Sequence, residues 1–475
     1  MLFANQSTAS ELASATLVAT GEITAYRGHL ISPTSAHAYS DFRDGVLVVD
    51  GAGKIMAAGP WAHVKDRCGQ ISRVIDYGKR LIIPGLIDLH LHLPQFAEVG
   101  RVGETLLGWL ERYIFPAEAR FRDTELARRI AFKFFRELAR NGTTLGVVFS
   151  TVHAAATDAA FKVAASLGNR VIMGKVMMDA NCPEDLSEDC ALSLLQSEEL
   201  CRRWHGHDSG RMLYAFTPRF AVTSSGDLLT GAAALWAKQP GTYVHTHLAE
   251  NNEEVNLVAR QFPGSRSYLD VYHQHGLLGE NSLFAHSIHL DKKDMAVLAK
   301  TSSSVAHCPS SNFFLKSGAF PYERMRAAGV RFGLGSDVAA GPEMSLFRVM
   351  KDAAYTQSDL WISPCELLYR ATLGAAEVLN LQHKLGSLTV GKDADFVVVD
   401  PVRKSGAFEN ILDQPSEDIL SNLVFLGDDR VVVSTFVRGR AIYESDSAIG
   451  RKPGKSEPAP HTMLQALIDS ASRSM

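Results

Sequence analysis

The sequence is poor in cysteine and has no long apolar run. Six cysteines are scattered over 475 residues, and none has the C-x-x-C spacing of a thiolate zinc site. They also lack the density of a disulfide framework, so a reducing compartment is expected. No apolar stretch reaches the roughly 18 residues that cross a bilayer. These absences argue against a disulfide scaffold, a cysteine-based metal site and a membrane-spanning protein.

The chain also lacks an excess of charge of either sign. It carries 48 basic and 52 acidic residues, for a formal net charge of −4, so neither nucleic acid nor an acidic membrane surface is expected as a partner. The first 20 residues contain no basic residue and no apolar core of a signal peptide. A cytoplasmic location is therefore expected. With 46% hydrophobic residues, the chain can bury a large core.

Short β-branched runs alternate with helical segments from Leu81 onward. The segment after the first run has apolar residues at helical spacing, with Asp123 as its expected cap and Asn141-Gly142 at its end. The eight runs are 85–92, 143–149, 170–177, 211–218, 242–250, 282–289, 302–309 and 330–337. Such alternation indicates parallel β/α units. We predict an α/β fold in which residues 81–385 form a closed (β/α)8 TIM-like barrel.

The two flanks of the barrel have a different pattern. Residues 17–80 and 386–445 contain short alternating runs punctuated by glycine, which indicate antiparallel strands. Neither flank is large enough for an independent sheet core. Both chain ends are therefore expected to combine into one small β-sandwich domain. Residues 446–475 are polar and contain proline and glycine, as is typical of a C-terminal tail.

Polar side chains stand where the predicted strands end. The stretch IIPGLIDLHLHLPQF (82–96) puts His90 and His92 on one face of a strand, at its end. Because the strand ends of such a barrel meet at one face, polar residues after later strands should join them. These later residues are Arg219, His245, His247, Glu250, His286, His307 and Asp337.

This set contains the ligands of a catalytic metal ion. Three imidazoles and one carboxylate bind a zinc-like ion and leave a position for water. The proposed ligands are His90, His92, His247 and Asp337. One Zn²⁺ per chain is expected, with iron as the alternative. Glu250 is placed to move protons, and His286 and Asp337 to act on the activated water. The predicted chemistry is metal-assisted hydrolysis.

Some of these residues, and the chain as a whole, have alternative interpretations. His307 and Cys308 do not make a nucleophile pair, because adjacent strand positions face opposite ways. His307 is better interpreted as a pocket wall or a structural group, and a supporting role for His245 stays open. The segments of the cytidine-deaminase type of zinc site are absent. A silent binding scaffold is the alternative to an enzyme, but it has no need of all four ligands and Glu250.

Several motifs resemble the amidohydrolase superfamily. They are PGLIDLHLH, the lone histidines after the fifth and sixth strands, HCPSSN (307–312) and GLGSDV (333–338). Within the superfamily they resemble the mononuclear-metal branch of nucleobase and triazine deaminases. GKDADFVVVD (391–400) is similar to the closing β domain of the family, so the likeness extends over nearly the whole chain. Two-metal members need a carboxylated lysine where this chain has TPRF, with Arg219 in its place.

A narrower resemblance, to purine-base deaminases, rests on HLHLPQF and on residues 102–118, 217–223 and 245–255. It implies that Gln95 reads the purine edge, that Arg219 holds a ring carbonyl oxygen, and that Phe220 and Trp109 flank the ring. His247, Glu250 and Asp337 complete the implied substrate-binding set. The implied reaction is hydrolysis of guanine to xanthine and ammonia by a homodimer. The alternative is deamination or dechlorination of another heterocycle, such as 8-oxoguanine, cytosine, a methylthioadenosine-like nucleoside or a triazine.

Overall fold

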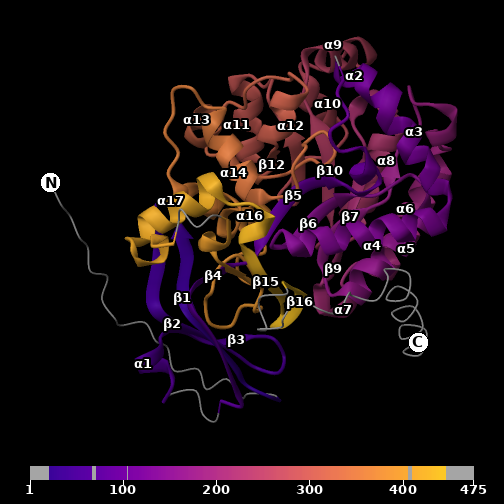
Figure 1. The fold of residues 1–475 in the computed structure, drawn as a ribbon. Coiled ribbons are helices and arrows are strands. Elements are labelled where there is room, and N and C mark those ends of the chain that lie inside the picture. Colours follow the sequence, from indigo (N-terminus) through magenta and orange to yellow (C-terminus); the bar gives the residue numbers. More distant parts are fainter. Residues whose placement is uncertain (1–20, 67–70, 104, 405–408, 446–475) are drawn as a thin grey trace.

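Two sheets organise the chain (Figure 1). The computed structural model describes residues 21–66, 71–103, 105–404 and 409–445. The predicted tail, 446–475, and the first four residues of the predicted β domain lie outside this range. The larger sheet is the barrel, and the smaller one combines strands from both chain ends.

The barrel is built from eight parallel strands, each within one of the eight predicted runs. They are β5 (Leu86–His92), β6 (Thr143–Phe149), β7 (Arg170–Gly174), β9 (Met212–Pro218), β10 (Tyr243–Leu248), β11 (Ser282–His286), β12 (Ser304–His307) and β13 (Arg331–Leu334). A short strand, β8 (Val176–Met177), pairs with β9. The predicted (β/α)8 architecture is confirmed.

The barrel closes between its first strand and the segment that follows its last. The backbone N–H of Asp337 donates to the carbonyl of His90 at 2.8 Å, and the N–H of His92 donates to the carbonyl of Val338 at 2.9 Å. The Asp88 carboxylate accepts from the N–H of Ser336 at 2.9 Å. These bonds place the end of β5 directly beside Asp337.

Helices cover the outside of the barrel. The main ones are α4 (Thr124–Arg140), α5 (Ala154–Leu167), α6 (Cys190–Trp204), α8 (Gly226–Lys238), α9 (Asn252–Gln261), α10 (Tyr268–Gln274), α11 (Lys292–Lys300), α12 (Pro309–Phe314), α13 (Tyr322–Ala327), α14 (Leu346–Tyr355), α15 (Pro364–Arg370) and α16 (Leu373–Val378). Asp123 caps α4 as predicted, accepting from two backbone N–H groups. Among the described residues, no helix has the length and apolar character of a bilayer crossing.

The second sheet joins the chain ends in the order β16-β15-β14-β4-β1-β2-β3. Its strands are β1 (Thr24–Ser35), β2 (Ala38–Val49), β3 (Ile55–Pro60), β4 (Arg73–Pro84), β14 (Phe396–Val399), β15 (Val432–Val437) and β16 (Arg440–Glu444). The two ends meet where β14 pairs antiparallel with β4. β1 and β4 run parallel, so the sheet is mixed rather than purely antiparallel.

One helix interrupts the C-terminal flank, which sequence reasoning described only as strands. Helix α17 (Ser416–Leu426) lies between β14 and β15 and packs against α14 and α15 of the barrel. Its residues Ile419, Leu420, Leu423 and Val424 are buried. Their spacing of one and four residues is that of a helix face rather than a strand. The shorter helices are α1 (Trp61–Val64), α2 (Leu106–Trp109), α3 (Phe115–Ala119) and α7 (His207–Gly210).

A buried network of charged side chains joins the second sheet to the N-terminal end of β7. The Arg170 guanidinium, whose side chain is 1% exposed, binds Asp393 at 2.8 Å and Asp395 at 2.8 and 3.2 Å. Lys54 also contacts Asp393, at 2.6 Å. Burial alone would raise the pKa of Asp393, but Arg170 and Lys54 outweigh it and lower that pKa to about 2. The carboxylates of GKDADF thus attach the sheet to the barrel.

We predict that Asp393→Asn lowers the free energy of unfolding by about 2 to 4 kcal/mol, because it leaves Arg170 buried without one counter-charge. The folded pKa lies below the ordinary value of 3.8. The stabilisation is therefore present above about pH 4 and is lost as the pH falls toward about 2. Thermal melting from about pH 7 down to about pH 2, which spans this titration, should show a shallower acid dependence in the variant.

Asp413→Asn is the matched control for this prediction. Its carboxylate pairs with Lys79 but is 57% exposed, so the substitution should change stability by less than about 0.5 kcal/mol. Equal melting of the two variants would contradict a stabilising role for the Arg170 network.

Candidate active site

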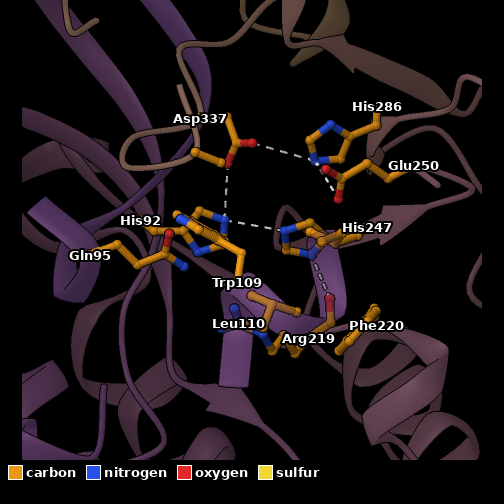
Figure 2. Close-up of a pocket in the computed structure, with 12 residues that line it drawn as sticks. His92, Gln95, Trp109, Leu110, Arg219, Phe220, His247, Glu250, His286 and Asp337 are labelled. Atoms are coloured by element: carbon orange, nitrogen blue, oxygen red, sulfur yellow. Dashed lines mark hydrogen bonds and ion pairs between the residues drawn. The ribbon is translucent and has the colours of Figure 1, made fainter. Parts of the chain in front are cut away.

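A pocket opens at the carboxyl ends of the barrel strands (Figure 2). Its walls contain every residue given a metal, catalytic or base-binding role from the sequence except His90. The lining residues are His92, Gln95, Leu106, Trp109, Leu110, Arg219, Phe220, His247, Glu250, His286, Asp337 and Ala340. His90 is fully buried, with its ring against those of His92 and His247.

The backbone directs these side chains inward in two ways. Along β5 and β10, residues two apart share a face, so His90 lies beside His92 and His245 beside His247. His286 and Asp337 instead have left-handed backbone, with φ of 65° and 52°. This conformation is uncommon in residues other than glycine and recurs at functional sites. The strained turns at these two strand ends coincide with the pocket.

Three donor atoms lie close together, and a fourth lies beside one of them. The Nε2 atom of His92 is 3.2 Å from that of His90 and 3.2 Å from that of His247. Asp337 Oδ1 lies 3.2 Å from His90 Nε2 and 3.3 Å from His92 Nε2. Ligands around a tetrahedral ion with bonds of about 2.0 Å are separated by about 3.3 Å. The Nε2 atoms of His90 and His92 and Asp337 Oδ1 are therefore spaced for a single ion, and His247 Nε2 lies beside that of His92.

The histidines are in the form that binds a metal. His247 Nδ1 lies 2.7 Å from the carbonyl of Arg219, which can only accept, so Nδ1 carries the hydrogen and Nε2 keeps its lone pair. Burial lowers the pKa of His90 to about 3, and it lowers that of His247 well below its usual range. Neutral imidazoles with a free Nε2 fit a divalent ion, as the converging atoms do.

Two further residues contact these imidazoles. His245 Nε2 lies 2.9 Å from His90 Nδ1, which gives His245 the supporting position that the sequence left open. The ring of Phe149, at the end of β6, packs against four histidines with centroid distances of 4.5 to 5.3 Å. Sequence reasoning missed Phe149, because a terminal apolar residue of a buried strand looks like ordinary core.

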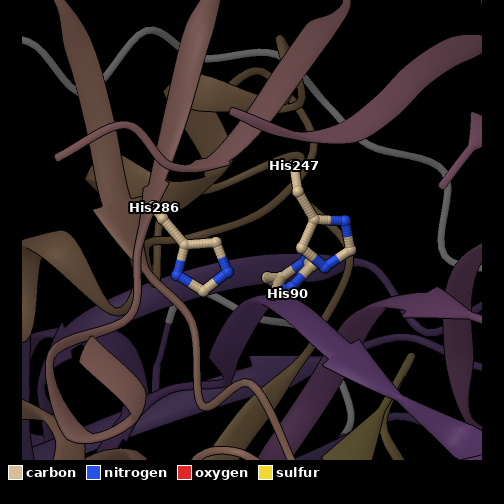
Figure 3. Close-up of side chains that lie close together, drawn as sticks. All are labelled: His90, His247 and His286. Carbon is tan, nitrogen blue, oxygen red and sulfur yellow. The ribbon is translucent and has the colours of Figure 1, made fainter. Parts of the chain in front are cut away.

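His286 completes a second converging group with His90 and His247 (Figure 3). Its Nδ1 lies 2.9 Å from Asn312 Oδ1, so this nitrogen donates and Nε2 faces the pocket. Nε2 lies 3.4 Å from Glu250 Oε2 and 3.7 Å from Asp337 Oδ2. Asn312, within the HCPSSN motif, was not singled out from the sequence. It orients His286 toward both carboxylates.

Glu250 is a buried carboxyl group prepared to hold a proton. Burial, and then the charge of Asp337, raise its pKa well above the usual range. Glu254 Oε2 accepts from the backbone N–H groups of Glu250 and the following residue, at 2.9 and 3.2 Å. The Tyr268 hydroxyl donates to Glu254 Oε1 at 2.8 Å. Helices α9 and α10 thereby fix the loop that carries Glu250.

The opposite wall contains the residues expected to contact a flat base. Gln95 lies in the 3₁₀ turn after β5, and Arg219 and Phe220 follow β9. Trp109, at the end of α2, donates from its indole N–H to the carbonyl of Arg101 at 2.8 Å. Glu118, on α3, binds both Arg219 and Gln95 and was missed from the sequence.

His307 lies outside this pocket. Its ring is buried and stacks on Phe320 with centroids 4.2 Å apart, which is the structural role considered from the sequence. Burial raises the pKa of the Cys308 thiol well above its usual range, and its Sγ contacts the carbonyl of Ala306 at 3.6 Å. A Cys308 thiolate nucleophile is not supported.

Comparison with known proteins gives one consistent result. A model of the amidohydrolase family matches residues 81–442. The chain is 42% identical to guanine deaminase of Escherichia coli (strain K12) over 415 residues, which are 86% of this chain and 93% of the relative. Among solved structures, E. coli guanine deaminase has a TM-score of 0.86 at 41% identity, covering 89% of this chain and 99% of its own. A guanine deaminase from C. acetobutylicum with bound guanine has a TM-score of 0.82 at 31% identity, covering 89% and 100%.

We predict that His247→Ala weakens binding of a divalent ion more than about 100-fold, since even loss of a supporting group costs up to that much. Elemental analysis of protein purified without chelators measures the effect. His273→Ala is the control, because that ring is 56% exposed at the end of α10, and it should keep the ion. Wild-type metal content in His247→Ala would refute the ligand assignment.

Proposed function

The chain belongs to the amidohydrolase family, and on that basis we propose that it hydrolyses guanine to xanthine and ammonia. One observation supports this most. The chain is 42% identical to a guanine deaminase, and a single pocket combines three features. They are a wall for the base (the base-reading wall: Gln95, Trp109, Arg219 and Phe220), histidines and a carboxylate that could hold a metal ion, and the buried carboxyl group of Glu250. The reaction needs all three of these parts.

The base-reading wall matches the chemistry of guanine. An arginine donates strongly to a carbonyl oxygen, and an amide both donates and accepts, as a lactam edge requires. Arg219 and Gln95 supply these groups on one side of the pocket (Figure 2). Phe220 and Trp109 supply apolar walls for the ring. With its lactam edge held there, the base directs its amino-bearing carbon toward Glu250.

The catalytic groups then act on protons. A divalent ion held by His90, His92, His247 and Asp337 would supply a water of lowered pKa. Glu250 accepts a proton from this water and delivers it to the ring nitrogen beside the reacting carbon. His286 and Asp337 hydrogen-bond the oxygen as it joins the carbon. Glu250 then takes the proton of the added hydroxyl group and delivers it to the amino nitrogen, so that the C–N bond breaks, ammonia leaves and the new carbonyl group of xanthine forms.

The identity of the metal ion, the cellular location and the oligomeric state are part of the same proposal. Zn²⁺ is the expected ion because three imidazoles and a carboxylate suit it best, with iron as the alternative. A cytoplasmic location agrees with the five described cysteines, which are free thiols. The homodimer rests on family resemblance alone. Elemental analysis and analytical ultracentrifugation test the ion and the assembly.

An ultraviolet assay tests the function directly. We expect rapid conversion of guanine to xanthine, well ahead of adenine, cytosine and 8-oxoguanine. The activity should disappear on metal removal and return with zinc, because the attacking water depends on the ion. Metal-dependent turnover of another heterocycle without turnover of guanine would overturn the substrate and leave the metal cluster standing.

Glu250→Gln should lower kcat by about 100- to 10,000-fold, the usual contribution of a positioned acid–base group. Its metal content should stay normal, since Glu250 is not among the proposed ligands. Glu253→Gln is the matched control, because Glu253 is exposed in the first turn of α9 and does not line the pocket. A Glu250→Gln enzyme with wild-type kcat would remove Glu250 from the mechanism.

A further inference from the structure

A buried carboxylate lies behind the base-reading wall. Glu118, on α3, is 1% exposed and is not itself part of the pocket lining. The NH1 group of Arg219 donates to its Oε1 at 2.6 Å and to its Oε2 at 2.8 Å. Gln95 Nε2 donates to Oε1 at 3.1 Å. One carboxylate therefore contacts both polar residues expected to read the base.

The contact with Arg219 fixes a buried charge. The residue is only 3% exposed, and a buried guanidinium needs a counter-charge close to it. Glu118 supplies that charge through NH1, while the ring of Phe115 lies 5.6 Å from the guanidinium carbon. NH1 is thus engaged away from the substrate. The other N–H groups are left for a carbonyl oxygen in the pocket.

The contact with Gln95 fixes the direction of an amide. A carboxylate only accepts, so Gln95 must turn its NH₂ group toward Glu118. On the other side, the backbone N–H of Ala339 donates to Gln95 Oε1 at 3.4 Å. Both neighbours require the same amide orientation. Gln95 therefore offers one defined arrangement of donor and acceptor to the pocket.

We propose that Glu118 is the positioning residue that sets the base preference of this site. It holds Arg219 and Gln95 in the arrangement that binds a 6-oxopurine edge and disfavours purines without the carbonyl. The identity of the base rests on the function proposed above. Recognition of the edge requires no turnover, so it can be measured separately from deamination.

Glu118→Gln is the informative substitution because it keeps the size and removes the charge. The new amide can donate to Gln95 Oε1, which permits Gln95 to flip, and it no longer neutralises Arg219. Both changes act on recognition of the carbonyl edge. A purine that lacks this edge should be insensitive to them.

The test compares two unreactive ligands by calorimetric titration of the metal-loaded protein. Hypoxanthine has the 6-oxo edge and purine lacks it, and neither carries the amino group to be hydrolysed. Wild-type protein should prefer hypoxanthine. In Glu118→Gln this preference should fall about 30-fold through weaker hypoxanthine binding, the size of one charge-assisted hydrogen bond.

Glu111→Gln is the matched control. It removes the same charge from the exposed face of the same segment and should keep the wild-type preference. A preference retained in Glu118→Gln, or an equal loss of affinity for both ligands, would show that Glu118 only supports the fold and would overturn the proposal.

A second pair of variants tests the proposal if Glu118→Gln alone does not fold. Arg219→Gln alone should lose the preference, and Glu118→Gln added to it should cause no further loss, because both charges are then gone. A further loss in the double variant would show that Glu118 acts independently of Arg219. If the wild-type protein does not turn over guanine, the proposed function is rejected. The preference for hypoxanthine over purine can still be measured, so the role of Glu118 is tested separately.

Discussion

Two backbone hydrogen bonds at the seam of the barrel hold the site together. They run from Asp337 N–H to the carbonyl of His90 and from His92 N–H to the carbonyl of Val338. They close the sheet and simultaneously bring Asp337 Oδ1 within 3.3 Å of two imidazole nitrogens. Asp88 reinforces the seam, since its Oδ1 accepts from the N–H groups of Ser336 and His90. Forming the fold and assembling the ligands are thus one event.

Hydrogen bonds from neighbouring groups set the orientation of the side chains in the pocket. The Arg219 carbonyl fixes the His247 ring, Asn312 fixes His286, and Glu254 fixes the loop of Glu250. Each supporter is buried and hydrogen-bonded, so its partner has little rotational freedom. Glu118 extends the same principle to the base-reading wall. The pocket is thus preorganised by hydrogen bonds within the protein.

The sequence predicted what depends on local pattern. Eight runs with helical segments between them indicated the barrel, and residues at strand ends indicated one face where the site should lie. Contacts between distant segments gave no such signal. Glu118 lies 101 residues before Arg219. Nothing in the local sequence FPAE (115–118) indicates that Glu118 contacts the segment TPRF (217–220). Phe149 and α17 were missed for a related reason, because apolar residues in a strand and in a flank have the same composition whatever they pack against.

The two ends of the barrel use buried charge in opposite ways. At the opening of β7, Arg170 is paired with Asp393 and Asp395 in short hydrogen bonds, and saturated groups of this kind hold a structure together. At the strand ends, His92 Nδ1, His286 Nε2 and Asp88 Oδ2 are buried without a hydrogen-bond partner among the described residues. Burying such groups costs stability. The chain tolerates this cost where the hydrogen bonds of the seam hold the backbone, and His286 Nε2, the one of these atoms on a residue that lines the pocket, faces Glu250 and Asp337.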